Sequence, residues 1–116
     1  MFLINGGSFM PPHLQKILAD LQKRLRMIYG DKLVKMVLYG SQARGDAAAG
    51  SDVDVLVVLR DEKVVQSEEI ARTLPDVADI SINHDMVISC LFLDEKRYAN
   101  EQSPLLLNIR QEGATI

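Results

Sequence analysis

The chain has 116 residues, 47% of them hydrophobic, and a formal net charge of −3. This length predicts a single domain with its own core, and the acidic balance excludes the basic surface expected of a protein that binds long nucleic acid. A lone cysteine, Cys90, excludes an internal disulfide and is typical of a reducing compartment, so we expect a cytoplasmic protein. No apolar run approaches the roughly 20 residues that a spanning helix needs, so we expect no membrane partner.

The N-terminal stretch and the first helix come next. Residues 1–10 lack the charged segment of a signal peptide, so we expect a tail followed by one domain over residues 11–116. Apolar residues then recur at helical spacing from Leu14 to Ile28, between a Pro-Pro pair and Gly30. This spacing predicts an amphipathic helix, with Lys and Arg on its solvated face.

Three apolar segments have the composition of strands. The first is Leu33–Tyr39, and the second, Val53–Leu59, is almost wholly aliphatic and β-branched, which predicts burial on both faces. Residues 61–83 then predict a helix that breaks near Pro75. The third strand is expected over residues 86–93.

Two helices are expected in the C-terminal part. Residues 94–100 begin a short helix, and Ser103 followed by Pro104 is typical of a capped helix start, with Gly113 as the end. Strands and helices in this order predict an α/β (α+β) domain, in which a small mixed β-sheet is flanked by helices.

The lengths of the connections predict how the strands pair. About 12 residues separate the first two strands, which is too short for a parallel crossover with a full helix, so we expect an antiparallel pair. About 24 residues with a helix separate the second and third, which favours a right-handed parallel crossover. The turn at Gly40 and Ser41 would then lie at the same end of the sheet as three acids, Asp52, Asp54 and Asp85.

The paired acids predict a metal site. Asp52 and Asp54 are two residues apart on a strand and therefore point to the same face, where two carboxylates repel each other unless a cation compensates. Mg²⁺ prefers such oxygen ligands. A third carboxylate, Asp85, would permit two ions ~4 Å apart that serve in-line transfer of a phosphoryl or nucleotidyl group. The alternatives are simple turn chemistry for the pair and, for Asp85, a loop acid that closes the preceding helix.

The turn before these acids predicts a phosphate site. Gly40 lets the backbone approach a ligand closely, and Ser41 begins a short helix whose first N–H groups favour anions. Arg44 lies one turn further on and could hold a terminal phosphate. A plain helix cap and a surface arginine are the alternative interpretations.

Taken together, "GSQARGDAAAGSDVDVLVV" resembles the signature of the DNA polymerase beta-like nucleotidyltransferase superfamily, in its small branch of minimal nucleotidyltransferase (MNT) domains. The signature is Gly-Ser, often followed by x-Ala-Arg-Gly, and then Ser-Asp-hydrophobic-Asp. The resemblance implies the polymerase beta-like fold, metal binding and catalysis by Asp52 and Asp54, and phosphate binding by Gly40 and Ser41. Asp85 is the best match to the third, metal-binding carboxylate, although no neighbouring motif supports that alignment.

The resemblance also implies an activity. Family members transfer a nucleoside monophosphate from a nucleoside triphosphate, and some of this size move AMP from ATP onto a small helical partner of the HEPN type, as antitoxin to its toxin. We therefore expect an Mg²⁺-dependent nucleotidyltransferase that binds two ions and acts on a hydroxyl acceptor. The alternative is a catalytically inactive module that sequesters a helical partner, because the chain shows no region for an acceptor.

Overall fold

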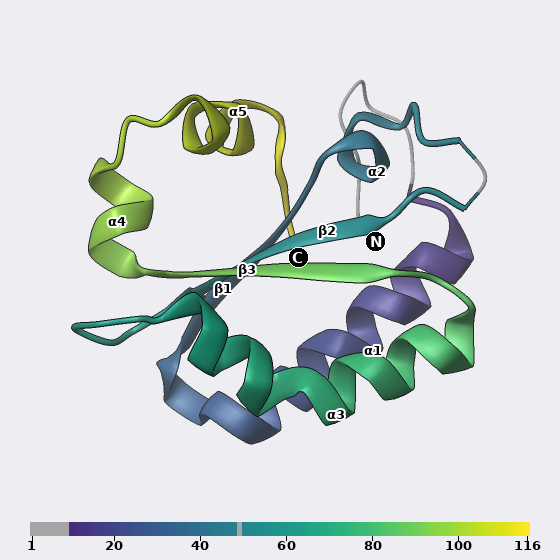
Figure 1. Ribbon diagram of the computed structural model, residues 1–116. Helices are drawn as coiled ribbons and strands as arrows, with labels where there is room; N and C mark the ends of the chain where they lie inside the picture. The colour runs from purple at the N-terminus through teal and green to yellow at the C-terminus, as the bar shows by residue number, and fades with distance from the viewer. Residues whose placement is uncertain (1–9, 49) are drawn as a thin grey trace.

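A computed structural model describes residues 10–48 and 50–116 as a mixed four-stranded sheet between two layers of helices (Figure 1). The strand order is β3-β2-β1-β4. Helices α1 and α3 cover one face, and α4 and α5 lie over the other. The short helix α2 follows the end of β1, and its Ala43 is buried in the core on the α1 side. The elements are α1 (Pro12–Tyr29), the 3-10 turn η2 (Gly30–Lys32), β1 (Leu33–Tyr39), α2 (Ser41–Arg44), β2 (Val53–Leu59), α3 (Gln66–His84), β3 (Ile88–Asp94), α4 (Glu95–Asn100), α5 (Pro104–Glu112) and β4 (Ala114–Thr115). The predicted fold class is confirmed.

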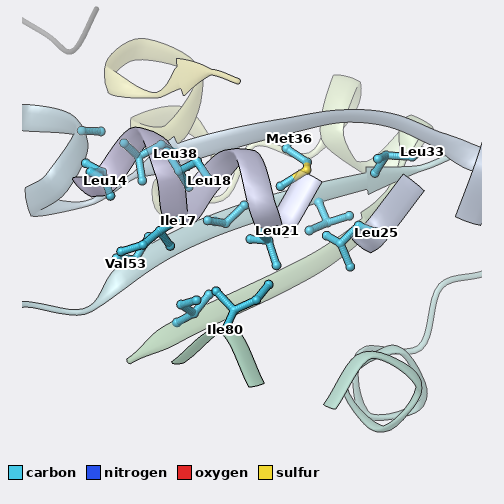
Figure 2. Packing of buried hydrophobic residues seen from close by; sticks show 14 of the residues in the cluster. Leu14, Ile17, Leu18, Leu21, Leu25, Leu33, Met36, Leu38, Val53 and Ile80 are labelled. Atoms are coloured by element: carbon cyan, nitrogen blue, oxygen red, sulfur yellow. The ribbon is translucent and has the colours of Figure 1, made fainter. Parts of the chain in front are cut away.

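The first helix forms as its apolar spacing predicts. One stripe of α1 is buried against the sheet (Figure 2), and its members are Leu14, Ile17, Leu18, Leu21 and Leu25. Proline stands at the start of the helix, where its missing N–H is not needed. Met10, which the sequence assigned to the tail, is buried in the same core with 2% of its surface exposed. The rest of the expected tail, residues 1–9, lies outside the described residues.

The strand pairing follows the prediction from connection lengths. β1 and β2 are antiparallel, and β2 and β3 are parallel. β2 is the central strand, and each of its residues except Asp54 is buried. The C-terminal end of β1, the N-terminal end of β2 and the N-terminal end of β3 therefore lie at the same end of the sheet.

The predicted break at Pro75 is wrong, because α3 runs without interruption from Gln66 to His84. Proline removes one helical hydrogen bond, the one to the carbonyl of Ala71. Both Ala71 and Pro75 lie on the exposed side of the helix, where water can satisfy the freed carbonyl. The helix therefore continues past the proline, and its buried side chains, such as Ile80, pack on the sheet.

The C-terminal part adds an element that the sequence did not predict. Asp94 and Ser103 cap α4 and α5 by accepting hydrogen bonds from the N–H groups of Arg97 and Leu106. The chain then returns to the sheet as β4, which pairs antiparallel with Val37 and Leu38 of β1. In residues 10–48 and 50–116, no helix is long and apolar enough to cross a bilayer.

Candidate active site

Asp54 is the polar exception in the buried strand β2. It lies between Tyr39 of β1 and Ser89 of β3, which are its register partners on the two sides. The flanking positions, Val53 and Val55, are fully buried on the opposite face. The strand therefore fixes the backbone of Asp54 and presents its side chain on the face that carries α5.

Asp52 precedes β2, and its negative charge acts on Asp54, the second residue of the strand. Burial raises the pKa of Asp54, and the negative charge of Asp52 raises it further. Burial and the charge of Asp54 in turn raise the pKa of the neighbouring Tyr39. Asp52 itself is exposed. The pair is thus a partly buried concentration of negative charge, which a bound cation would relieve.

Gly40 lies directly against this carboxylate. Its φ of 75° is in the region that L side chains rarely adopt, and a Cβ on Gly40 would stand 2.6 Å from Oδ2 of Asp54. A side chain at position 40 would therefore fill the space beside the carboxylate. The turn between β1 and α2 requires glycine for both its conformation and its contact.

Helix α2 is a single turn held by its own ends. Gly45 closes it with a left-handed backbone, and its N–H donates to the carbonyl of Ser41 over 3.0 Å. Ala43 is fully buried and anchors the turn. The Gln42 side chain donates to the carbonyl of Ser51 over 3.1 Å, which ties α2 to the segment that leads into Asp52. The predicted phosphate turn and the predicted metal ligands therefore belong to one connected unit.

Arg44 extends from α2 toward α5. Its guanidinium lies 3.3 Å from Oδ2 of Asp46 and 3.8 Å from Oε2 of Glu112. Arg44 is one of the residues that line a hollow of about 190 Å³. The others are Tyr39, Gly40, Leu105, Asn108, Ile109 and Glu112. Tyr39 and Gly40, which line this hollow with Arg44, are also neighbours of Asp54: Tyr39 is its register partner, and Gly40 lies against its Oδ2.

Asp85 has a different position from the one expected. It ends α3 with a left-handed φ of 51° and lies three residues before β3 begins. Its side chain is exposed and borders a shallow hollow that it shares with Gly50. This geometry matches the alternative that the sequence left open, an acid that closes the preceding helix.

The structure brings together Asp52 and Asp54 but does not add Asp85 to them. Within residues 10–48 and 50–116, no three His, Cys, Asp or Glu side chains form a group that could hold a metal ion. Residues 1–9 and 49 contain none of these four residue types. A role for Asp85 as the third ligand therefore stays a prediction.

Sequence reasoning missed Ser89, the register partner of Asp54 on β3. It is exposed, and paired residues on neighbouring strands point to the same face. A single serine inside an apolar strand does not by itself indicate a functional residue. A count of the parallel register from Asp54 could have found it, but that count needs the start of β3, which the sequence placed two residues too early.

Comparisons with known proteins agree on one family. A family model described as a nucleotidyltransferase domain matches residues 14–106. Two proteins of Methanocaldococcus jannaschii, each named "Putative protein adenylyltransferase", are similar to the chain. One is 31% identical over 74 residues, or 64% of this chain and 73% of the relative. The other is 31% identical over 99 residues, or 84% of this chain and 56% of the relative.

A solved structure has the same fold. The crystal structure of a Sulfolobus solfataricus protein, described as a "putative nucleotidyltransferase", superposes with a TM-score of 0.53 at 17% sequence identity. The match covers 81% of this chain and 84% of that one. The two chains therefore share the arrangement of strands and helices that positions Asp54.

Proposed function

Because the chain belongs to the nucleotidyltransferase domain family, we propose that it transfers AMP from ATP to a hydroxyl group in a reaction that depends on Mg²⁺. Transfer of a nucleotidyl group is the activity of the family, and the nucleotide, the cation and the acceptor are the proposed specifics. The observation that carries the proposal is the contact between the Gly40 turn and Asp54, beside the charge of Asp52.

Asp52 and Asp54 would hold the cation, and two features support the fit. Burial and the charge of Asp52 raise the pKa of Asp54, and a divalent ion bound there would stabilise its charged form. Asp54 is only half-buried, and glycine at position 40 adds no side chain that would crowd its Oδ2. When bound, Mg²⁺ would supply a Lewis acid that polarises phosphate oxygens.

Gly40, Ser41 and Arg44 are proposed to bind the phosphates. The backbone of Gly40 permits close approach, and the Ser41 hydroxyl can donate a hydrogen bond. Arg44 pairs with Asp46 and Glu112 on the surface, where ion pairs are weak. A triphosphate would offer this guanidinium a stronger, bidentate partner.

The proposed reaction is an in-line displacement at the α-phosphorus of ATP. The acceptor oxygen forms a bond to that phosphorus while the bond to the bridging oxygen of pyrophosphate breaks. Pyrophosphate leaves with the electron pair of the broken bond, and the acceptor proton passes to Asp52, Asp54 or solvent. The Gly40–Ser41 turn would hold the leaving pyrophosphate, so that the acceptor must approach from the opposite side.

The proposed acceptor is a protein hydroxyl. Support comes from the name of the two Methanocaldococcus jannaschii relatives, "Putative protein adenylyltransferase", together with the motif resemblance to MNT domains. On the same basis we propose a small helical partner of the HEPN type, to which the chain would be the antitoxin.

The first prediction is that both acids are essential for transfer. Asp52→Asn and Asp54→Asn should each lower the rate of AMP transfer by about 100-fold or more, because each removes a charged ligand from the cation. The measurement is transfer of label from [α-³²P]ATP to a co-expressed protein partner, with Mg²⁺ present. Asp61→Asn is the matched control, since Asp61 is exposed and follows the far end of β2. Equal transfer by the wild type and both site variants would refute the proposal.

A second candidate function is a binding module without chemistry. The placement of Asp85 outside the pair favours it, since two carboxylates are fewer than two-ion transfer normally uses. In this case the chain would bind and silence its partner with no label transferred, and Asp54→Asn would silence it equally well. The labelling experiment above, combined with an assay of partner inhibition, separates the two candidates.

A further inference from the structure

A serine stands beside Asp54 on β3, away from the proposed phosphate turn. The pairing of the strands places Tyr39, Asp54 and Ser89 in one row across the sheet. Tyr39 leads directly into the Gly40 turn, so the β1 end of this row is the proposed phosphate side. Ser89, on β3, is at the other end and is exposed.

Two cations in one site need ligands that they share. They lie about 3.5–4 Å apart and must be held from both sides. Asp52 and Asp54 come from the same strand end. A second cation, on the acceptor side, would therefore need a carboxylate from β3 at the height of Asp54, which is the position of Ser89.

No other acid in residues 10–48 and 50–116 takes that position. Asp85 caps α3 before β3 begins. Asp94 is at the opposite end of β3, where it pairs with the last residue of β2 and caps α4. Asp46 and Glu112 lie toward α2 and α5, on the β1 side, where both pair with Arg44.

We propose that this site binds a single divalent cation together with the nucleotide, on the Asp52–Asp54 side, and that Ser89 takes the place of the ligand for a second one. The inference builds on the proposed function. The inference has a chemical consequence: the acceptor hydroxyl would lie next to Ser89 instead of next to a carboxylate. Ser89 can donate or accept a hydrogen bond, but it carries no charge. Deprotonation of the acceptor then depends on the two aspartates or on solvent.

The test counts cations directly. Mn²⁺ replaces Mg²⁺, and α,β-methylene ATP, whose α-phosphorus cannot be transferred, replaces ATP. Equilibrium dialysis gives the number of bound Mn²⁺ ions, and electron paramagnetic resonance reveals the spin coupling of two neighbouring ions. We expect one uncoupled Mn²⁺ in the wild type and an unchanged count in Asp85→Asn. Ser89→Asp should gain a second, coupled Mn²⁺.

Each outcome decides between the alternatives. Two coupled ions in the wild type, with one lost in Asp85→Asn, would overturn the inference while leaving the proposed function in place. A folded Ser89→Asp protein that still binds one ion would also overturn it, and Ser89→Asn is the uncharged control for packing. Failure of the wild type to bind any Mn²⁺ above the level of Asp54→Asn would overturn the proposed function itself.

Discussion

At the scale of single residues, Gly40 and Asp54 depend on each other for their positions. Glycine at position 40 permits the positive φ and leaves the space that Oδ2 of Asp54 occupies. Asp54 in turn remains partly buried because the turn packs over it, and that burial contributes most to its raised pKa. A substitution at either residue is therefore expected to shift the position of the other.

A second prediction tests this contact. Gly40→Ala should destabilise the protein by about 1–3 kcal/mol more than Gly30→Ala, because the new methyl group overpacks against Asp54. Gly30 is the matched control, since its φ of 56° brings the same kind of backbone strain but a Cβ there meets nothing within 4 Å. Urea denaturation of the two variants measures the difference. Equal stabilities would contradict the contact.

At the scale of elements, α3 protects the open edge of the sheet. β3 is at one end of the strand order, and open strand edges can pair with other chains. The side chain of Gln66, in the first turn of α3, donates to the carbonyl of Cys90 over 2.9 Å and accepts from the N–H of Phe92 over 2.7 Å. One amide thus replaces a neighbouring strand at these two groups.

A third prediction follows for this amide. Gln66→Ala should cost about 1–3 kcal/mol, because it leaves a donor and an acceptor of β3 without their partner. Gln111→Ala, at an exposed position of α5, should change the stability by less than about 0.5 kcal/mol. Thermal or urea denaturation measures both. If Gln66→Ala matched the control, the edge would not depend on this side chain.

At the scale of the whole molecule, the site reduces the stability of the fold in the absence of a cation. The pKa of Asp54 is raised in the folded protein, whereas in the unfolded chain it is near the usual value of about 3.9. Between these two pKa values the folded state holds more protons than the unfolded state. The free energy of unfolding therefore falls as the pH rises through this window.

A fourth prediction uses this linkage. In EDTA at neutral pH, Asp54→Asn should be more stable than the wild type, and the difference should shrink as the pH falls through the window toward 4. Mg²⁺ with a nucleotide should raise the Tm of the wild type but not of Asp54→Asn. Thermal denaturation over this pH range is the measurement, with Asp61→Asn as control. A wild type that is more stable than Asp54→Asn without a cation would contradict the sign.

The sequence by itself determined the helices, the three main strands, their directions and the pairing of Asp52 with Asp54. These features depend on local spacing, on connection length and on a long ordered motif, all of which can be read along the chain. The tertiary structure alone decided that α3 continues past Pro75, that β4 joins β1, and that Ser89 rather than Asp85 stands beside Asp54. Each of these features depends on which residues pair across strands or are exposed to water, and neither can be read along the chain. An error of two residues in the start of a strand is enough to change which residues are paired with each other.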